Sequence, residues 1–313
     1  GTGQFFISKL YSIELNPLDW ATGEAAPDDT RAVVVAGRQL WIMGTRSTEV
    51  WYDSGDRFFP FTRISGAVTD IGIANADTIG RIHSSIFFVG SDYKVYSTTG
   101  YEIIPVSNTS IELMIDEKNV RRFLAFTFYN NGHYFYVLHL DDFNTVVYDA
   151  TTGLWHKRSS LIEGEDPYTG GSRWKINGAI NRYDRKTIYG YSARSFYILS
   201  TDTYTEDGIR IRREAVTLPL NPSPNHVTIA EMQLDKESGG YDNLVGDNDE
   251  IWLQLSGDDG KTWGNRRVGT LGKRGQYTNR SRWQRLGQHR DVIARIVITD
   301  PVPVRILGLW VRS

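Results

Sequence analysis

A short acidic hairpin is the stretch whose residue types and spacing come nearest to a known chemical motif. The run Ser256-Gly257-Asp258-Asp259-Gly260-Lys261-Thr262-Trp263 matches the Asp-box pattern Ser-x-Asp-x-Gly-x-Thr-Trp. In such a turn the aspartate accepts hydrogen bonds from turn amides, the glycine takes a positive φ and the tryptophan packs against the core. The expected role is therefore structural, and it falls on Ser256, Asp258, Gly260, Thr262 and Trp263.

No other arrangement of side chains in the sequence points to a catalytic or metal site. His133 and His139 lie on one expected strand and on one face, but roughly 20 Å apart, which is too far to share an ion. The acidic stretch 241–250 lacks the Asp-x-Asp-x-Asp-Gly run of a calcium loop. A phosphate loop, a Gly-x-Ser-x-Gly elbow and a zinc-protease motif are also missing. Carboxylates are plentiful, but none is singled out as a glycosidase pair. We therefore predict no catalytic residue, no metal and no cofactor.

Arginine is concentrated in the last third of the chain, with almost no acid between its members. We interpret this cluster as a candidate subunit-interface patch, because guanidinium groups suit carboxylate or phosphate partners and are favoured at protein interfaces. Ordinary solvated hairpins are the alternative, and DNA binding is a lesser one. The patch comprises Arg266, Arg267, Lys273, Arg274, Arg280 and Arg282, and Arg285, Arg290 and Arg295 lie near it in sequence.

Composition narrows the class of protein. The chain has 313 residues, a formal net charge of −2 and no cysteine, so disulfides and thiolate metal sites are impossible. A general nucleic-acid binder would usually be far more basic. The longest apolar run, 32–36, is far shorter than the roughly 20 residues that span a bilayer. With 17 Tyr, 13 Phe and 9 Trp, the composition favours strands.

The elements that must position the residues of interest include strand pairs that recur along the chain. Within 31–55 the pattern predicts three strands, at 33–36, 39–43 and 49–52, joined by turns that contain glycine. The last two strands recur further along the chain, so that Tyr52, Tyr96, Tyr148 and Tyr197 occupy equivalent places. Their spacing falls in the range of about 40 to 50 residues that four-stranded propeller blades use. Because blades hide their faces only against neighbours, we predict a β-propeller, with unrelated hairpins as the alternative.

The remaining segments complete the expected organisation. We expect a strand at 5–13, a loop at 15–29, a helix at 109–117 capped by Thr109 and Glu112, and a long Gly-rich loop at 161–175. After 201–208 the strands lengthen, and alternation of Ile251, Leu253 and Leu255 with Trp252 and Gln254 indicates one buried face. The predicted fold is all-β, with propeller blades at 1–208 and an antiparallel β-sandwich at 209–313.

The chain resembles the packaged-DNA stabilisation proteins, or tail hub (tail nozzle) subunits, of short-tailed bacteriophages. The likeness rests on VVVAGRQLWIMGTRSTEVWY and the FPF segment within 27–66, on SIELMID before the blade at Arg121, and on NTVVYDATTGLWHKRSS. It continues in LSGDDGKTWG, RWQRLGQHR and PVRILGLWVRS. Family members extend further at the N-terminus, which agrees with a chain that opens Gly1-Thr2-Gly3 without an initiator methionine and is compatible with missing first blades.

The resemblance implies a structural, non-enzymatic component of the phage tail. Such subunits assemble as a hexamer beneath the portal and its adaptor ring, continue the tube by which DNA leaves, and help to retain the genome until the tail needle or plug is released. They also neighbour the tailspikes. The expected location is the virion, and the host cytoplasm during assembly, with DNA contacted only by passage through the lumen and no membrane partner.

Two alternatives from other functional classes remain open from the sequence. A sialidase-like glycoside hydrolase is suggested by the Asp-box and the blades, and it would need an arginine cluster and a Tyr/Glu pair at the propeller's centre. A carbohydrate- or receptor-binding module is suggested by Trp20, Trp174 and Trp263, which we expect to be exposed.

Overall fold

The computed structural model describes residues 3–9, 11–23, 28–57, 59–115, 119–167, 170–182, 185–190, 195–200, 202–220, 226–237, 250–272, 276 and 279–312. Two compact units form: residues 1–159 with 173–199, and residues 160–172 with 200–313. The expected boundary between residues 208 and 209 falls in the hairpin between β19 (Thr205–Glu206) and β20 (Ile209–Arg210), and it remains a prediction. In the described part, no helix is long and apolar enough to cross a membrane.

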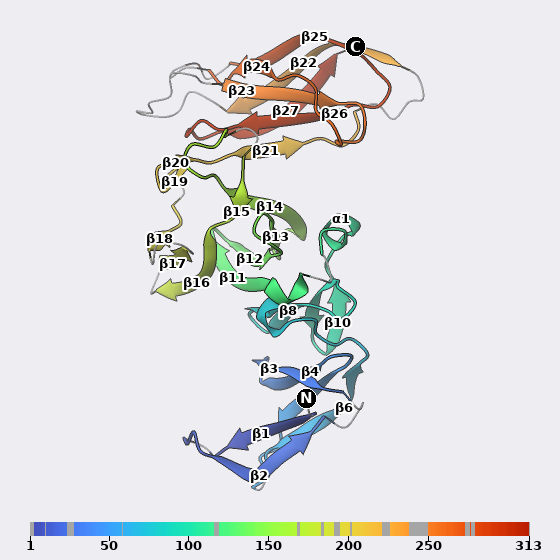
Figure 1. The fold of residues 1–313 in the computed structure, drawn as a ribbon, viewed down its shortest axis with the longest axis vertical. Helices are drawn as coiled ribbons and strands as arrows, with labels where there is room; N and C mark the ends of the chain where they lie inside the picture. The colour runs from blue at the N-terminus through green and yellow to red at the C-terminus, as the bar shows by residue number, and fades with distance from the viewer. Residues whose placement is uncertain are drawn as a thin grey trace. The chain divides into compact units, whose positions relative to one another are not determined.

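The first unit consists of antiparallel sheets whose strands follow one another in sequence (Figure 1). It opens with a hairpin, β1 (Gln4–Ser8) and β2 (Leu15–Thr22). The first four-stranded sheet contains β3 (Thr30–Ala36), β4 (Gln39–Gly44), β5 (Thr48–Asp53) and β6 (Phe61–Thr69). The second contains β7 (Gly80–Ile82), β8 (Ser85–Val89), β9 (Val95–Thr99) and β10 (Glu102–Pro105).

A five-stranded and a three-stranded sheet complete this unit. The former contains β11 (Leu124–Asn130), β12 (His133–His139), β13 (Thr145–Asp149), β14 (Leu154–Ser160) and β15 (Ser172–Arg173). The latter contains β16 (Ile176–Arg182), β17 (Arg185–Gly190) and β18 (Phe196–Ile198). The described helical segments are η1 (Ala76–Thr78), α1 (Thr109–Glu112) and η2 (Val120–Arg122).

The two four-stranded sheets and the five-stranded sheet bury apolar side chains on both of their faces. On β4, Leu40 and Ile42 pack towards the β1–β2 hairpin, whereas Trp41 and Met43 pack into a cluster with the second sheet. The same alternation continues on β8 and β12. Ile86 and Phe88 face the first sheet while Phe87 faces the third, and Tyr136 and Leu138 face the second sheet while Val137 faces the β16–β18 sheet. The sheets therefore pack in sequence order, as neighbouring blades do.

The expected strand pairs are confirmed, but the equivalence of the tyrosines is only partly right. All four lie on the third strand of their sheet. Their register differs, because Tyr52 pairs with Gln39 at the start of β4, whereas Tyr96 pairs with Phe88 near the end of β8. Since both faces of these sheets are apolar, no single face fixes where an aromatic residue must stand along the strand.

Two local predictions are wrong. Residues 15–29 are not all loop, because β2 pairs with β1 from Leu15 to Thr22 and tolerates Pro17 at the edge of a two-stranded hairpin. The described helix α1 ends at Glu112 and is capped by Asn108, whose side chain accepts from the N–H of Ile111. Residues 116 and 117 of the expected helix lie outside the described part.

The second unit contains a β-sandwich of two antiparallel sheets. One sheet has the order β21 (Arg213–Val216), β26 (Ile293–Ile298), β23 (Glu250–Ser256) and β24 (Arg267–Thr270). The other has the order β25 (Ser281–His289), β22 (Val227–Glu237) and β27 (Arg305–Arg312). Met232 and Leu234 of the second sheet meet Ile251 and Leu253 of the first in one buried cluster. The predicted burial of the Ile251 and Leu253 face is confirmed.

Candidate interaction surface

The Asp-box residues form a tightly bonded turn after β23. The Ser256 hydroxyl donates to Asp258 Oδ1 at 2.7 Å and accepts from the N–H of Gly260 at 2.8 Å. The N–H and hydroxyl of Thr262 both donate to Asp258, at 2.9 and 2.6 Å. Gly260 has φ +83°, in the region that favours glycine. Hydrogen bonds from Thr262 and then from Ser256 lower the pKa of Asp258 to about 2. These contacts suit the structural role we expect.

Replacing Asp258 with asparagine should destabilise the second unit at neutral pH and weaken its acid sensitivity. Because the folded-state pKa lies below the ordinary value of 3.8, the carboxylate contributes stability above about pH 4 that is lost as the pH falls towards about 2. Chemical denaturation of both proteins between these pH values measures the difference. Asp259→Asn is the matched control, because the Asp259 side chain makes no hydrogen bond to the described residues. Equal pH profiles for Asp258→Asn and the unaltered chain would contradict the assignment.

Trp263 is half-buried beside this turn. The Arg295 guanidinium lies 4.1 Å from the centre of its ring and donates to Gln254 Oε1 at 2.6 Å. Trp20 and Trp174 were also expected to be exposed. Trp20 is exposed, but the exposed fraction of Trp174 is only 5%, so the expectation is wrong for Trp174. Trp174 is buried because it packs against Val137 and other apolar residues of the β11–β15 sheet.

The arginines of the candidate patch are distributed over both sheets of the sandwich. Arg267 is the first residue of β24 in the four-stranded sheet, and Arg266 directly precedes it. Arg282 lies at the start of β25 in the three-stranded sheet, and Arg280 directly precedes that strand. The two edges approach each other, since Arg267 Nη1 donates to the Arg285 carbonyl at 3.3 Å. Lys273 and Arg274 lie outside the described residues. Their role at an interface remains a prediction.

Acidic residues from β22 stand opposite the arginines of β25. Arg280 pairs with Asp235 at 3.4 Å, and Arg282 pairs with Glu231 at 3.6 Å. On the other side of β22, Arg305 pairs with Glu237 at 3.8 Å. These acids are distant in sequence from the arginines, so the scarcity of acids between the arginines did not reveal them. Exposed pairs of this kind are each worth only about 0–1 kcal/mol.

The outward side of the three-stranded sheet carries one large exposed aromatic ring. Trp310 on β27 is 64% exposed, and its Nε1–H donates to Asp235 Oδ2 at 3.0 Å, which holds the ring in one orientation. Beside it is a hollow of about 250 Å³. Its lining residues are Glu231, Gln233, Arg282, Trp310, Val311 and Arg312. We call the outward residues of β25, β22 and β27, from Arg280 and Arg282 across to Trp310 and Arg312, the three-stranded face.

The outer side of the four-stranded sheet is partly covered by residues 160–172. Arg266 forms an ion pair with Asp166 at 3.0 Å and stacks over Trp252 at 4.4 Å from the ring centre. Arg212 donates to the Gly170 carbonyl at 3.4 Å. Part of the Gly-rich loop expected at 161–175 thus contacts the sandwich. The three-stranded face carries Trp310 in the open, and sequence reasoning missed it because one tryptophan near a strand end gives no spacing signal.

The histidines of β12 have structural partners. His139 is fully buried, and its Nε2 bonds to the Ile176 carbonyl at 2.8 Å while its Nδ1 bonds to the Thr145 hydroxyl at 2.7 Å. Because the carbonyl can only accept, Nε2 carries the proton. Burial lowers the pKa of His139 to about 4. Within the described residues, no group of three or more His, Asp or Glu could hold a metal ion.

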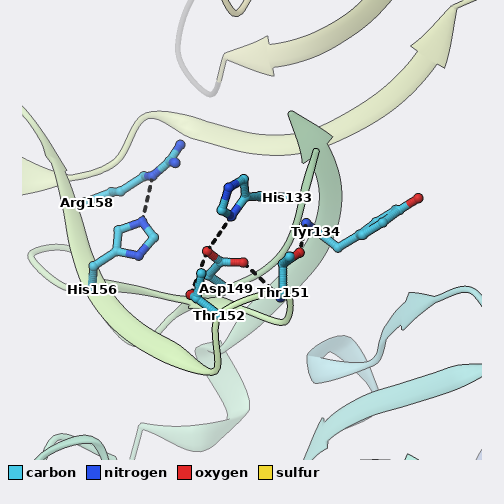
Figure 2. A network of polar contacts seen from close by, with 7 residues as sticks. All are labelled: His133, Tyr134, Asp149, Thr151, Thr152, His156 and Arg158. Carbon is cyan, nitrogen blue, oxygen red and sulfur yellow. Dashed lines mark hydrogen bonds and ion pairs between the residues drawn. The ribbon is translucent and has the colours of Figure 1, made fainter. Parts of the chain in front are cut away.

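Figure 2 shows a polar network around Asp149 at the end of β13. His133 Nδ1 lies 2.7 Å from Asp149 Oδ2, and Thr152 donates its hydroxyl to the same oxygen at 2.8 Å. Asp149 also accepts from the N–H of Thr151 at 2.9 Å. In a Ser-His-Asp arrangement the histidine stands between the hydroxyl and the acid, whereas here the acid stands between them. The network therefore holds a turn and does not activate Thr152.

Arg158 is also drawn in Figure 2. Three aromatic rings that the figure leaves out surround its guanidinium group. Its guanidinium carbon lies 5.2 Å from the ring centre of Phe128, 5.3 Å from Phe135 and 4.8 Å from Trp174, and its Nε donates to His156 Nε2 at 3.2 Å. Burial, followed by the charge of Arg158, lowers the pKa of His156 to about 4. Cation–π contacts of this kind fix the cation in place.

Comparison with known families accounts for both units. Residues 1–195 match the family model described as the β-propeller of bacteriophage P22 Gp10, and residues 212–313 match the model described as its β-sandwich. These matches confirm the predicted order of a propeller followed by a sandwich. A search of curated proteins gave no match.

Solved structures show only weak likeness. A glycoside hydrolase family 43 arabinoxylan arabinofuranohydrolase from Bacillus subtilis is 12% identical, over 90% of this chain and 78% of that chain, with a TM-score of 0.21. An exo-inulinase from Aspergillus awamori is 8% identical, over 90% of this chain and 72% of that chain, with a TM-score of 0.24. Likeness at this level carries no argument about function.

Proposed function

Because this chain belongs to the bacteriophage P22 Gp10 family and is a structural tail-hub and stabilisation subunit of the virion, we propose that it works without catalysis, as one copy in a hexameric ring. The ring lies below the portal adaptor ring, contacts the tail needle or plug and the tailspikes, and assembles in the host cytoplasm. DNA crosses its lumen without being bound. The family match agrees with the resemblance found in the sequence and disfavours the glycoside hydrolase alternative.

The observation that carries this proposal beyond the family is the exposed three-stranded face. Tryptophan and arginine are the residue types most enriched at energetically important points of protein interfaces. Trp310 is held in place by Asp235 and flanked by Arg282 and Arg312 around a hollow. We assign docking of a neighbouring tail protein to this face, because an anchored ring needs little ordering on binding.

Charge supports passage of DNA through the ring without tight binding. The net charge is −2, and three arginines of the three-stranded face pair with acids of β22 and its end. A lumen with many unpaired cations would neutralise phosphates and slow the exit of DNA. Arginines that are paired within the chain can still bind a protein partner, because acidic groups of the partner can replace the acids of β22 in these ion pairs.

DNA retention can be tested with phage heads that contain packaged DNA and an adaptor ring but lack the hub. Adding the purified chain should slow the release of DNA into a nuclease-accessible form, relative to the same heads without the chain. Release at an unchanged rate, under conditions in which the chain binds the heads, would contradict the retention role. Sustained sugar release from surface polysaccharide by the pure chain would contradict the absence of catalysis.

A further inference from the structure

The two edges of the three-stranded sheet differ in what lies beside them. β25 adjoins β24 of the other sheet, because the Trp283 Nε1–H donates to the Arg267 carbonyl at 3.0 Å and the Ser281 hydroxyl donates to the Thr270 carbonyl at 2.7 Å. β27 pairs with β22 on one side, and among the described residues no strand pairs with its other side. An edge of this kind presents backbone N–H and C=O groups to which a further strand can bind.

Apolar side chains of β27 overhang the core at this edge. Val311 pairs with Met232, and Ile306 pairs with Lys236, so each shares the inward side of the sheet with its partner. Met232 and Lys236 are buried, whereas Val311 and Ile306 are 43% and 41% exposed. Leu307, which the register leaves unpaired at a bulge, is also exposed. A strand added beside β27 would cover these side chains.

β22 shows which kind of strand fits β27. Glu231 stands opposite Arg312 in the register and Glu237 stands opposite Arg305, so acids six positions apart (237 minus 231) meet an arginine at each end of β27. Glu237 pairs with Arg305, but Glu231 pairs with Arg282 instead. Arg312 is exposed and forms no ion pair with any described residue. The edge therefore still offers positive charge to an acidic partner.

A second copy of β27 is a poor occupant of this edge. Two copies related by a two-fold axis would pair antiparallel, which places Arg305 of each opposite Arg312 of the other. Like charges directly opposite one another destabilise a sheet. The same two arginines would attract a strand that carries acids at the matching positions.

We propose that β27 accepts an added strand, namely an extended segment of a neighbouring tail protein that carries acidic residues six positions apart. The acids pair with Arg305 and Arg312 on the outward side, and apolar residues at alternate positions between them cover Val311 and Ile306 on the inward side. In such strand addition the main-chain hydrogen bonds supply affinity and the side chains supply specificity. The inference deepens the proposed function, because it names how a partner docks at the edge of the three-stranded face, and it rests on that function.

A designed peptide tests this edge without any other tail protein. Its sequence, Ser-Glu-Val-Thr-Val-Thr-Val-Glu-Ser, places the two glutamates six positions apart on one side and the valines on the other. Fluorescence polarisation of the labelled peptide measures its binding to the full chain. We expect saturable binding that the Arg305→Glu, Arg312→Glu double variant weakens by about tenfold or more, because two attractive pairs become repulsive. Lys261→Glu, an equal change of charge at the exposed Asp-box turn, should weaken binding by less than about twofold.

Hydrogen exchange distinguishes strand addition from other modes of binding. With the peptide bound, amides within 305–312 should exchange at least about fivefold more slowly, whereas those of β25 should not change. Binding without this protection would overturn the proposal, and so would the absence of saturable binding up to about 1 mM peptide. A peptide with lysine in place of both glutamates should bind at least about tenfold more weakly. Equal binding of the two peptides would overturn the acidic chemistry of the partner.

The outcomes separate this inference from the hub function. Failure of the peptide to bind would overturn strand addition but would not affect docking of the adaptor ring, which is measured with the unaltered chain. Conversely, peptide binding by a chain that binds neither the adaptor ring nor the needle protein would support strand addition and contradict the proposed hub position.

Discussion

Replacing Trp310 with alanine is expected to weaken binding to the neighbouring tail protein by about 30-fold or more. The ring is 64% exposed on the three-stranded face, and the Asp235 carboxylate fixes it by a 3.0 Å hydrogen bond. Interface tryptophans of this kind cost at least about 2 kcal/mol when truncated, and each 1.4 kcal/mol is about a tenfold change in affinity. The measurement is the dissociation constant for the portal adaptor ring, with the needle protein as the second partner to test.

A matched control comes from the other sheet of the sandwich. Val268→Ala shortens an exposed apolar side chain on β24, away from the Trp310 hollow, and should change affinity by less than threefold. Because Trp310 lies outside the buried cluster, its replacement should leave the denaturation midpoint nearly unchanged. Unchanged affinity of Trp310→Ala for both partners would show that the three-stranded face is not the docking surface.

Replacing Trp41, which lies between the first two sheets, is expected to have a large effect on the stability of the first unit. Trp41 is 1% exposed and belongs to the cluster shared with Ile86 and Phe88 of the second sheet. Truncation to alanine should destabilise the first unit by about 3–5 kcal/mol, from lost burial and the cavity left behind. Hydrogen exchange followed by mass spectrometry, peptide by peptide, measures the loss in the first unit separately from the second.

Two further variants make the Trp41 result specific. The Trp41 Nε1–H is buried and meets no hydrogen-bond acceptor among the described residues, so Trp41→Phe removes an unpaired donor and should cost much less than alanine. Val35→Ala, on the exposed side of the adjacent strand, should change stability by less than about 0.5 kcal/mol. If Trp41→Ala left protection of β8 and β9 intact, the first two sheets would not be stabilising one another.

Strand pairs were predictable because their determinants are local. The two-residue turn between β3 and β4 has positive φ at both Gly37 and Arg38, which is the geometry that a tight hairpin needs and that glycine makes accessible. By contrast, residues 15–22 contain Pro17 and resemble a loop in isolation. They form a strand because β1 supplies the partner, which is information outside the segment.

The candidate surface was only half predictable from the sequence, because part of it depends on strands that are distant in sequence. The arginine-rich segment correctly drew attention to Arg280 and Arg282, but their acidic partners Glu231 and Asp235 come from a strand about 50 residues earlier. The alternation of β22, with Met232 and Leu234 buried between outward polar residues, would have indicated that neighbour. What could not be read from the sequence is the pairing of β22 with both β25 and β27, since it depends on the sheet order.

Light-scattering mass can decide whether this chain docks as a hub subunit in a phage tail. The purified chain is mixed with portal adaptor rings and separated by size. We predict one complex whose mass equals the ring plus a number of chains set by the symmetry of the ring, and its loss with Trp310→Ala. Elution of ring and chain as separate species, at concentrations at which the chain is folded and in excess, would contradict the claim.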